Sequence, residues 1–368
     1  MEVLHQWPSV DFVFPNAATR DAMLRTGRFI PENIALIDVD VWGYGGGRKV
    51  FVTMPKFKPG TPVDECGRLW VLDSGTVEIF TKDLKMICPP QILVFDLNTD
   101  KLIGRYPFPK NVLDKDSLLV TIAVDNRDFR CYNTFAYVAD VVAYKLIVLD
   151  AGRGRWWRVS SNYFYPYPLA GNFDINNVKF DFMDGVIGLA LGPVNGTGDR
   201  RLYFHSLASV RESWVSTSVI RNESLFVTGN GAPDAFKVSE YTRPSQSVAE
   251  AMTPNGVMFF GLLSNNSIAC WNSRLAYRPE NIEIVAKDDY TLQFQTGIKI
   301  HDGYIWALTS RFQNYIVGQF DYFNINYRIL VGSVPLLTYG TSCYKPDDYP
   351  TSFNQFYSPF YDALVIKK

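Results

Sequence analysis

Six short apolar runs along the chain each carry an aromatic residue near their centre, and we use that residue as a marker. The markers are Phe51, Trp70, Tyr137, Tyr203, Phe259 and Trp306. Successive markers are 19, 67, 66, 56 and 47 residues apart, and each of the last four intervals is long enough for a four-stranded sheet. One twisted sheet cannot bury both faces alone, whereas radial repetition supplies a neighbour on each side. The pattern therefore predicts an all-β fold, a six-bladed β-propeller.

A second apolar run precedes four of the markers and predicts the innermost strand of each blade. These runs cover residues 121–124, 188–191, 248–252 and 296–300. Two strand–turn–strand patterns, at residues 92–106 and 146–159, predict outer hairpins. One helix is predicted at residues 16–27, with Asn16 as its N-cap.

The first interval between markers is too short for a complete blade. Three strands of about five residues with minimal turns need roughly 20 residues, and only 19 separate Phe51 from Trp70. We therefore expect the first blade to lack its outer strands and the second to lack its inner strand. We assign residues 1–343 to a single propeller domain. The Tyr-, Phe- and Pro-rich end, residues 344–368, shows no strand rhythm and is predicted to be a mobile tail.

Composition and charge narrow the classes of function. The chain is 47% hydrophobic and 15% aromatic, enough for one large core, and its 36 basic and 37 acidic side chains give a net charge of −1. This balance argues against binding of nucleic acid. No run of eighteen apolar residues predicts membrane insertion, and residues 1–7 do not resemble a signal peptide. A Ser-His-Asp spacing and a glycine-rich phosphate loop are both missing, so a hydrolase or kinase is not predicted and no cofactor is expected.

Three N-x-S/T sequons and five cysteines point in contrast to the secretory route. The sequons are candidate glycosylation sites at Asn195, Asn222 and Asn265. The cysteines are Cys66, Cys88, Cys131, Cys270 and Cys343. None of them belongs to a C-x-x-C pair or lies near a histidine at metal-ligand spacing, so no metal site is predicted. Their odd number leaves one thiol without a partner.

Polar residues follow the markers at positions that antiparallel pairing brings to one end of the channel. They are Asp73, Ser74, Asp140, Ser206, Thr309 and Ser310, with Thr296 opposite them. Polar groups at one mouth of a propeller form the default binding site. The alternative for each is that it caps a strand and satisfies turn amides. Glu250 is a separate candidate, because a carboxylate inside an apolar strand is costly unless it is paired or exposed to the channel.

The segment DECGRLWVLDSG, residues 64–75, resembles the signature of the yellow and major royal jelly protein family of insects. Supporting motifs are PPQILVFDL from Pro89, LYFHSLAS from Leu202, ACWN from Ala269, NYRIL from Asn326 and GTSC from Gly340. The resemblance implies a secreted six-bladed propeller. It also implies disulfides that join Cys66 to Cys131 and Cys270 to Cys343, which leaves Cys88 as the odd cysteine.

The chain departs from the family pattern between Thr53 and Asp64. Similar proteins carry several tens of additional residues there, often including a cysteine, which we take as the missing partner of Cys88. We hypothesise an apparent internal deletion, through a skipped exon, a gene-model error or a truncated variant. Such an event also explains the missing signal peptide, and sequencing of the transcript tests it.

The resemblance implies three classes of function, of which we rank an enzyme of melanin formation first. Isomerisation of dopachrome moves a proton from carbon to oxygen on an indole quinone, and needs a base, a proton donor and an aromatic wall. In this hypothesis Asp140 or Glu250 is the base and His205 is the acid or donor. Arg311 pairs with a substrate carboxylate, and Phe312 forms the wall.

The second class is sequestration of biogenic amines, as in similar proteins of sand-fly saliva. Thr296, Ser310 and Phe312 match part of that pocket, although Ser310 replaces an asparagine, and Asp73 or Asp140 is the expected partner of the ammonium group. The third class is a structural cuticle or nutritive protein without ligand chemistry. The expected partner is thus a small aromatic ligand. A structural role stays open for His205, a solvated one for Arg311 and a core position for Phe312.

Overall fold

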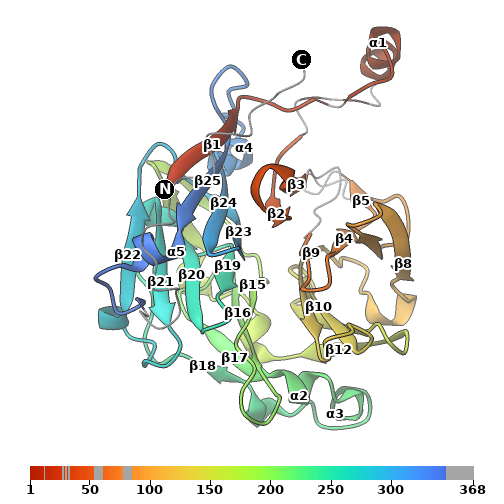
Figure 1. The fold of residues 1–368 in the computed structure, drawn as a ribbon, viewed down its shortest axis with the longest axis vertical. Coiled ribbons are helices and arrows are strands. Elements are labelled where there is room, and N and C mark those ends of the chain that lie inside the picture. The colour runs from red at the N-terminus through yellow and green to blue at the C-terminus, as the bar shows by residue number, and fades with distance from the viewer. Residues whose placement is uncertain are drawn as a thin grey trace.

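The computed structural model describes residues 1–344 except 12, 27–28, 30, 32–33, 54–60 and 78–84. These residues form β-sheets arranged in a ring, with one strand of each large sheet facing the centre (Figure 1). Residues 345–368, the expected tail, lie outside the described residues, as does most of the segment in which we expected a deletion.

Four sheets of the ring are complete blades with four antiparallel strands each. The first contains β9 (Leu119–Asn126), β10 (Thr134–Asp140), β11 (Lys145–Asp150) and β12 (Arg155–Ser160). The second contains β15 (Val186–Leu191), β16 (Arg201–Ser206), β17 (Ser213–Ser216) and β18 (Lys237–Val238). The third contains β19 (Glu250–Met252), β20 (Val257–Leu262), β21 (Ser267–Asn272) and β22 (Ile282–Lys287). The fourth contains β23 (Gln295–His301), β24 (Tyr304–Ser310), β25 (Tyr327–Ser333) and β1 (Glu2–Trp7).

The fourth blade draws its outer strand from the other end of the chain. Strand β1 pairs antiparallel with β25, from Glu2 opposite Val331 to Trp7 opposite Tyr327. In Figure 1 the red first strand accordingly lies beside the blue last strand. The sequence pattern did not predict this strand.

The start of the ring has smaller sheets than the four complete blades, and the predicted number of blades is therefore wrong. A three-stranded sheet holds β4 (Arg68–Asp73), β7 (Gln91–Asp96) and β8 (Lys101–Pro107), and a two-stranded hairpin holds β2 (Asp38–Trp42) and β3 (Lys49–Thr53). The described residues therefore form five blades rather than the predicted six. The hairpin remains a two-stranded ribbon, because the interval from Phe51 to Trp70 cannot supply three further strands.

The described residues also contain two small hairpins, five short α-helices and several 3-10 turns. The hairpins pair β5 (Thr76–Val77) with β6 (Lys85–Met86) and β13 (Asn172–Ile175) with β14 (Val178–Asp181). The helices are α1 (Ala17–Arg25), α2 (Thr217–Ile220), α3 (Glu223–Val227), α4 (Phe312–Ile316) and α5 (Val334–Thr338). Helix α1 confirms the predicted helix, and the Asn16 side chain accepts a hydrogen bond from the Thr19 amide at its start. None of the helices in the described ranges is long and apolar enough to cross a bilayer.

All six markers lie in strands, and their burial shows how the blades pack. Phe259 and Trp306, in complete blades, are at most 1% exposed, whereas Phe51 in the β2–β3 hairpin is only half-buried. Buried apolar clusters fill the junctions between neighbouring blades. Another cluster joins the hairpin to the fourth blade through Val39, Val41 and Trp306.

Candidate functional site

A pocket opens at the centre of the ring, where the starts of the inner strands meet. Its lining includes three aromatic rings, two hydroxyl groups and four charged side chains: Phe182, Phe294, Phe312, Thr121, Thr296, Asp38, Asp184, Glu250 and Lys299. A second cavity lies at the other ends of the same strands and shares Glu250 and Lys299 with the pocket. Because the inner strands run in the same direction, the two cavities occupy opposite ends of one channel. We call the first cavity the central pocket.

One side of the central pocket is aromatic. The rings of Phe294 and Phe312 meet edge to face, with centroids 5.0 Å apart and an interplanar angle of 65°. They belong to a buried cluster with Leu207 and Val248, so the wall is held by packing behind it. Strand β23 then places Thr296 beside this wall.

An ion pair joins the hairpin to the fourth blade in the pocket. The Lys299 Nζ atom donates to both carboxylate oxygens of Asp38, at 2.9 and 3.0 Å. Strand β2 approaches β23 closely here because Gly297 has no side chain, and a Cβ at that position would lie 2.8 Å from Asp38 Oδ1. Burial alone lowers the pKa of Lys299, but the carboxylates of Asp38 and Asp40 raise it overall. Burial also raises the pKa of Asp40 to about 7, against the opposing charge of Lys299.

Glu250 on β19 connects the pocket to a buried charge cluster. The Nδ1 atom of His205 lies 3.2 Å from Glu250 Oε2 and 3.1 Å from Glu212 Oε2. The Arg243 guanidinium donates to the same Glu212 oxygen at 2.8 Å. The side chains of all four residues are fully buried.

Burial and the neighbouring charges together shift the pKa values of His205 and Glu212. Burial and Arg243 act to lower the pKa of His205, yet the neighbouring glutamates Glu250 and Glu212 raise it overall. Burial, and then the charge of Glu250, raise the pKa of Glu212. The imidazole fits behind the pocket wall because Gly188 on β15 has no side chain, and a Cβ there would lie 2.2 Å from the His205 ring.

The structure brings only some of the sequence-predicted site residues together. Glu250, Thr296 and Phe312 line the central pocket. His205 lies behind it, in contact with Glu250. Ser310 and Arg311 do not line either cavity; Ser310 is buried at the end of β24, and the Arg311 amide donates to the Asn326 carbonyl.

Asp140 and Asp73 hold backbone near their strands and line neither cavity. The buried Asp140 carboxylate accepts hydrogen bonds from the amides of Leu118 and Ala143, at 2.9 and 3.1 Å. Burial raises its pKa, against these hydrogen bonds. Asp73 accepts hydrogen bonds from the Gly75 amide and the Gln91 side chain, both at 3.0 Å. These contacts match the capping alternative for both carboxylates.

The pocket also contains residues that the sequence pattern did not single out. Asp38 and Lys299 interrupt apolar strands just as Glu250 does, so the same signal was available for them. Asp184, Phe182 and Phe294 lie just outside the strands and carried no such signal. Glu212 and Arg243 reach the cluster only through the fold.

The two expected disulfides are present. Cys66–Cys131 ties the three-stranded sheet to the first complete blade, and Cys270–Cys343 ties β21 to the segment after α5. Their Cα atoms lie 6.5 and 6.3 Å apart, within the usual range. Cys88 is a free cysteine.

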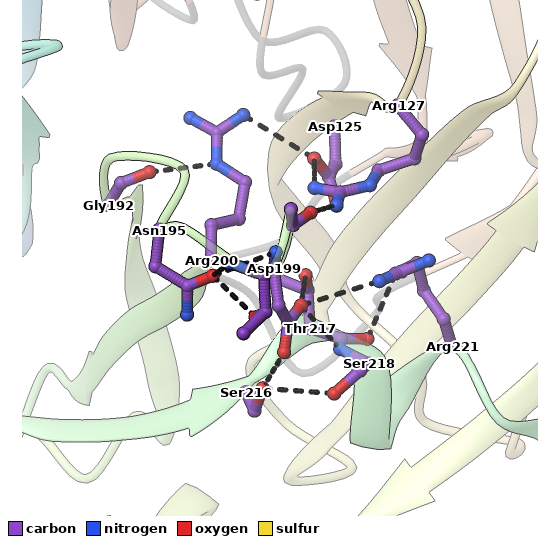
Figure 2. A network of polar contacts seen from close by, with 12 residues as sticks. Asp125, Arg127, Gly192, Asn195, Asp199, Arg200, Ser216, Thr217, Ser218 and Arg221 are labelled. Carbon is purple, nitrogen blue, oxygen red and sulfur yellow. Dashed lines mark hydrogen bonds and ion pairs between the residues drawn. The ribbon is translucent and has the colours of Figure 1, made fainter.

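The three sequons differ in exposure. Asn195 is exposed in a loop of the second blade, and its side-chain oxygen accepts hydrogen bonds from Thr197 and from the Asp199 amide. Figure 2 shows this loop beside two ion pairs of Asp125, one with Arg127 of the same blade and one with Arg200 that connects the first two complete blades. Asn222 is exposed, whereas Asn265 is half-buried and its Ser267 fully buried.

Comparison with known proteins assigns the family. A family model described as "Major royal jelly protein" matches residues 60–343, a span that contains every strand from β4 to β25. The chain belongs to the yellow and major royal jelly protein family. Two of its curated relatives are "Protein yellow" of Drosophila melanogaster, 31% identical, and of Drosophila subobscura, 32% identical. Each alignment covers 92% of this chain, with 70% and 66% of the respective relative.

As a member of this family, the chain is shorter than its relatives within the matched region. The aligned region spans 385 residues, more than the 368 of the chain, so the yellow proteins contain residues without a counterpart here. Among solved structures, virginiamycin B lyase from Staphylococcus aureus has a TM-score of 0.39 at 13% identity over 73% of this chain and 67% of its own. The Dos1 propeller also scores 0.39, at 12% identity over 77% and 61%.

Proposed function

We propose that this family member is a secreted protein of insect catecholamine and melanin metabolism that binds a small aromatic amine in the central pocket. The observation that carries the proposal is the pairing of an aromatic wall with carboxylates in one pocket. Small-molecule sites are mostly apolar, with a few polar groups that fix the orientation of the ligand. The central pocket has this composition. The two disulfides of the protein are consistent with an oxidising extracellular environment.

The charges in the lining favour a cationic ligand. Three acidic side chains, Asp38, Asp184 and Glu250, oppose the single cation Lys299. We assign Asp184, which lines the pocket two residues after Phe182, as the partner of the ligand ammonium.

The neutral groups suit the ring of the ligand. Phe294 and Phe312 present an edge-to-face pair against which a catechol or indole ring packs. The Thr296 hydroxyl in the same lining is a partner for a ring hydroxyl. We therefore propose phenolic amines such as dopamine and serotonin as the ligand class.

One observation favours a second candidate, isomerisation of a dopachrome-type quinone. Glu250 brings a carboxylate to the pocket that contains the aromatic wall, and such a reaction needs a base within reach of a carbon-bound proton. His205, in contact with Glu250 from behind, is then a positioning residue rather than the group that donates to substrate.

Calorimetry with dopamine and serotonin tests the first candidate, and loss of the orange colour of dopachrome tests the second. We expect saturable heat without turnover. Asp184→Asn is expected to weaken binding by about 1.5–3 kcal/mol, or roughly 10- to 100-fold, through loss of a charge-assisted hydrogen bond. The control Asp174→Asn changes an exposed carboxylate on β13. Colour loss above a boiled control supports the isomerase instead. If both the heat and the colour loss are absent, both candidates are contradicted and a structural protein is supported.

A further inference from the structure

Three potential metal ligands from two neighbouring blades meet behind the wall of the central pocket. They are His205 on β16, Glu212 just before β17 and Glu250 on β19. One ligand atom from each lies within 4.8 Å of the other two, and all three side chains are fully buried. The spacing of cysteines and histidines in the sequence did not predict this set, because it contains no cysteine and two of its members are glutamates.

Several oxygens of this cluster lack hydrogen-bond partners. Within the described part of the chain, both carboxylate oxygens of Glu250 and the Oε1 atom of Glu212 are buried without one. Native proteins satisfy nearly all buried polar atoms, so such a group indicates a water molecule or an ion. The ion pair between Glu250 and His205, at 3.2 Å, satisfies at most one of these oxygens.

The net charge of the cluster indicates that the partner of these oxygens is positively charged. Two carboxylates face one permanent cation, Arg243, so a neutral His205 leaves one uncompensated negative charge. Uncompensated buried charge is strongly destabilising. The cluster therefore needs a further cation, which is either a proton, on His205 or on one of the glutamates, or a metal ion.

We propose that His205, Glu212 and Glu250 bind a divalent first-row transition metal ion, such as Zn²⁺ or Mn²⁺. The His205 Nδ1 atom lies 3.1 and 3.2 Å from the two Oε2 atoms. Adjacent ligands of one ion, each bonded at about 2.0–2.2 Å, have separations of this size. An imidazole nitrogen with two carboxylates suits zinc or manganese better than magnesium or calcium, which prefer oxygen ligands alone.

Arg243 is compatible with this site as an outer partner. It donates to Glu212 Oε2 at 2.8 Å and orients that carboxylate; Oε2 keeps a further lone pair for the ion, and Oε1 has no hydrogen-bond partner. Hydrogen-bonded partners of this kind commonly orient metal-binding carboxylates. The metal site goes beyond the proposed amine binding and borders the central pocket only through Glu250.

Titration of the chelator-treated, full-length protein with Zn²⁺ and with Mn²⁺ tests the proposal, with no amine present. We expect one ion per chain, and a gain in melting temperature when the ion is added. Glu250→Gln, Glu212→Gln and His205→Gln should each weaken binding by at least about tenfold, the least that loss of an outer partner alone produces. Asp174→Asn, an exposed carboxylate on β13, is the control and should bind as wild type.

Two results would overturn the metal site. The first is absence of ion binding by the folded wild-type protein, which identifies the further cation as a proton on His205 or on a glutamate. The second is wild-type affinity in Glu250→Gln, which is decisive even if the other variants do not fold. Glu250→Gln keeps the side-chain shape and leaves in place the hydrogen bonds of Arg243 to Glu212 and to the Ser209 carbonyl. Amine binding is measured separately, so failure of either proposal leaves the other standing.

Discussion

The complete blades and the start of the ring both contain strands with an aromatic marker, yet the contacts that join these strands to neighbouring sheets differ. Between complete blades, buried apolar clusters fill each junction. Between the β2–β3 hairpin and the three-stranded sheet, the contacts among described residues are mainly polar. Asp40 accepts a hydrogen bond from the Val63 amide at 2.7 Å, and Lys49 pairs with Asp100 at 2.6 Å.

This difference follows from the number of residues available and not from the local sequence. The runs around Phe51 and Phe259 are alike in pattern, and both form the strand after an innermost strand. Only Phe259 is covered on both sides, by its own four-stranded sheet and by the next blade. Burial of an aromatic marker is therefore a property of the neighbouring sheets.

The largest expected effect is a difference between two matched truncations. Phe259→Ala removes a fully buried ring and should lower the free energy of unfolding by about 3–5 kcal/mol. Phe51→Ala removes a half-buried ring and should lower it by less than half as much. Urea unfolding of both variants measures the difference. Equal losses would mean that the hairpin is packed as tightly as a complete blade.

Removal of each disulfide should give a smaller and more local effect. We expect the Ser variants of either pair to lose about 2–4 kcal/mol of stability, since both bonds close long loops. Hydrogen exchange should rise mainly in β4, β7 and β8 when Cys66 and Cys131 are replaced, because that sheet has fewer strands to hold it. Replacement of Cys270 and Cys343 should instead loosen the segment after α5. Uniform exchange across the ring in both variants would contradict this distinction.

The polar junction should also give stability a pH dependence through Asp40. Its pKa of about 7 in the folded protein exceeds the value of 3.8 for an unperturbed Asp, so the folded state retains the proton more strongly. This contribution to stability is present at low pH and is lost as the pH rises from about 4 to about 7, by at most about 1.4 kcal/mol per pH unit. Asp40→Asn should remove that slope in unfolding measurements made across this range. An identical slope in the variant would assign it to another group.

The sequence predicted individual strands and the helix better than the number of blades or the residues of the central pocket. All six marked strands, the two outer hairpins and the helix at residues 17–25 are confirmed, because period-two patterns and caps are local signals. The count of six blades is wrong, and β1 was missed because its partner β25 lies at the far end of the chain. Charged residues inside apolar strands were the best guide to the pocket, as Glu250 shows and as Lys299 and Asp38 also would have shown. Glu212 lies only seven residues after His205, but Glu250 and Arg243 join them through the fold, which no local spacing reveals.

The pairing of β1 with β25 has a consequence for biosynthesis. Strand β1 leaves the ribosome long before its partner strand, residues 327–333, is made. Until then β1 has no strand beside it, and unpaired strand edges are prone to aggregation. Ring closure is therefore a late event in the life of the nascent chain, and a polypeptide released before residue 327 cannot complete its fourth blade.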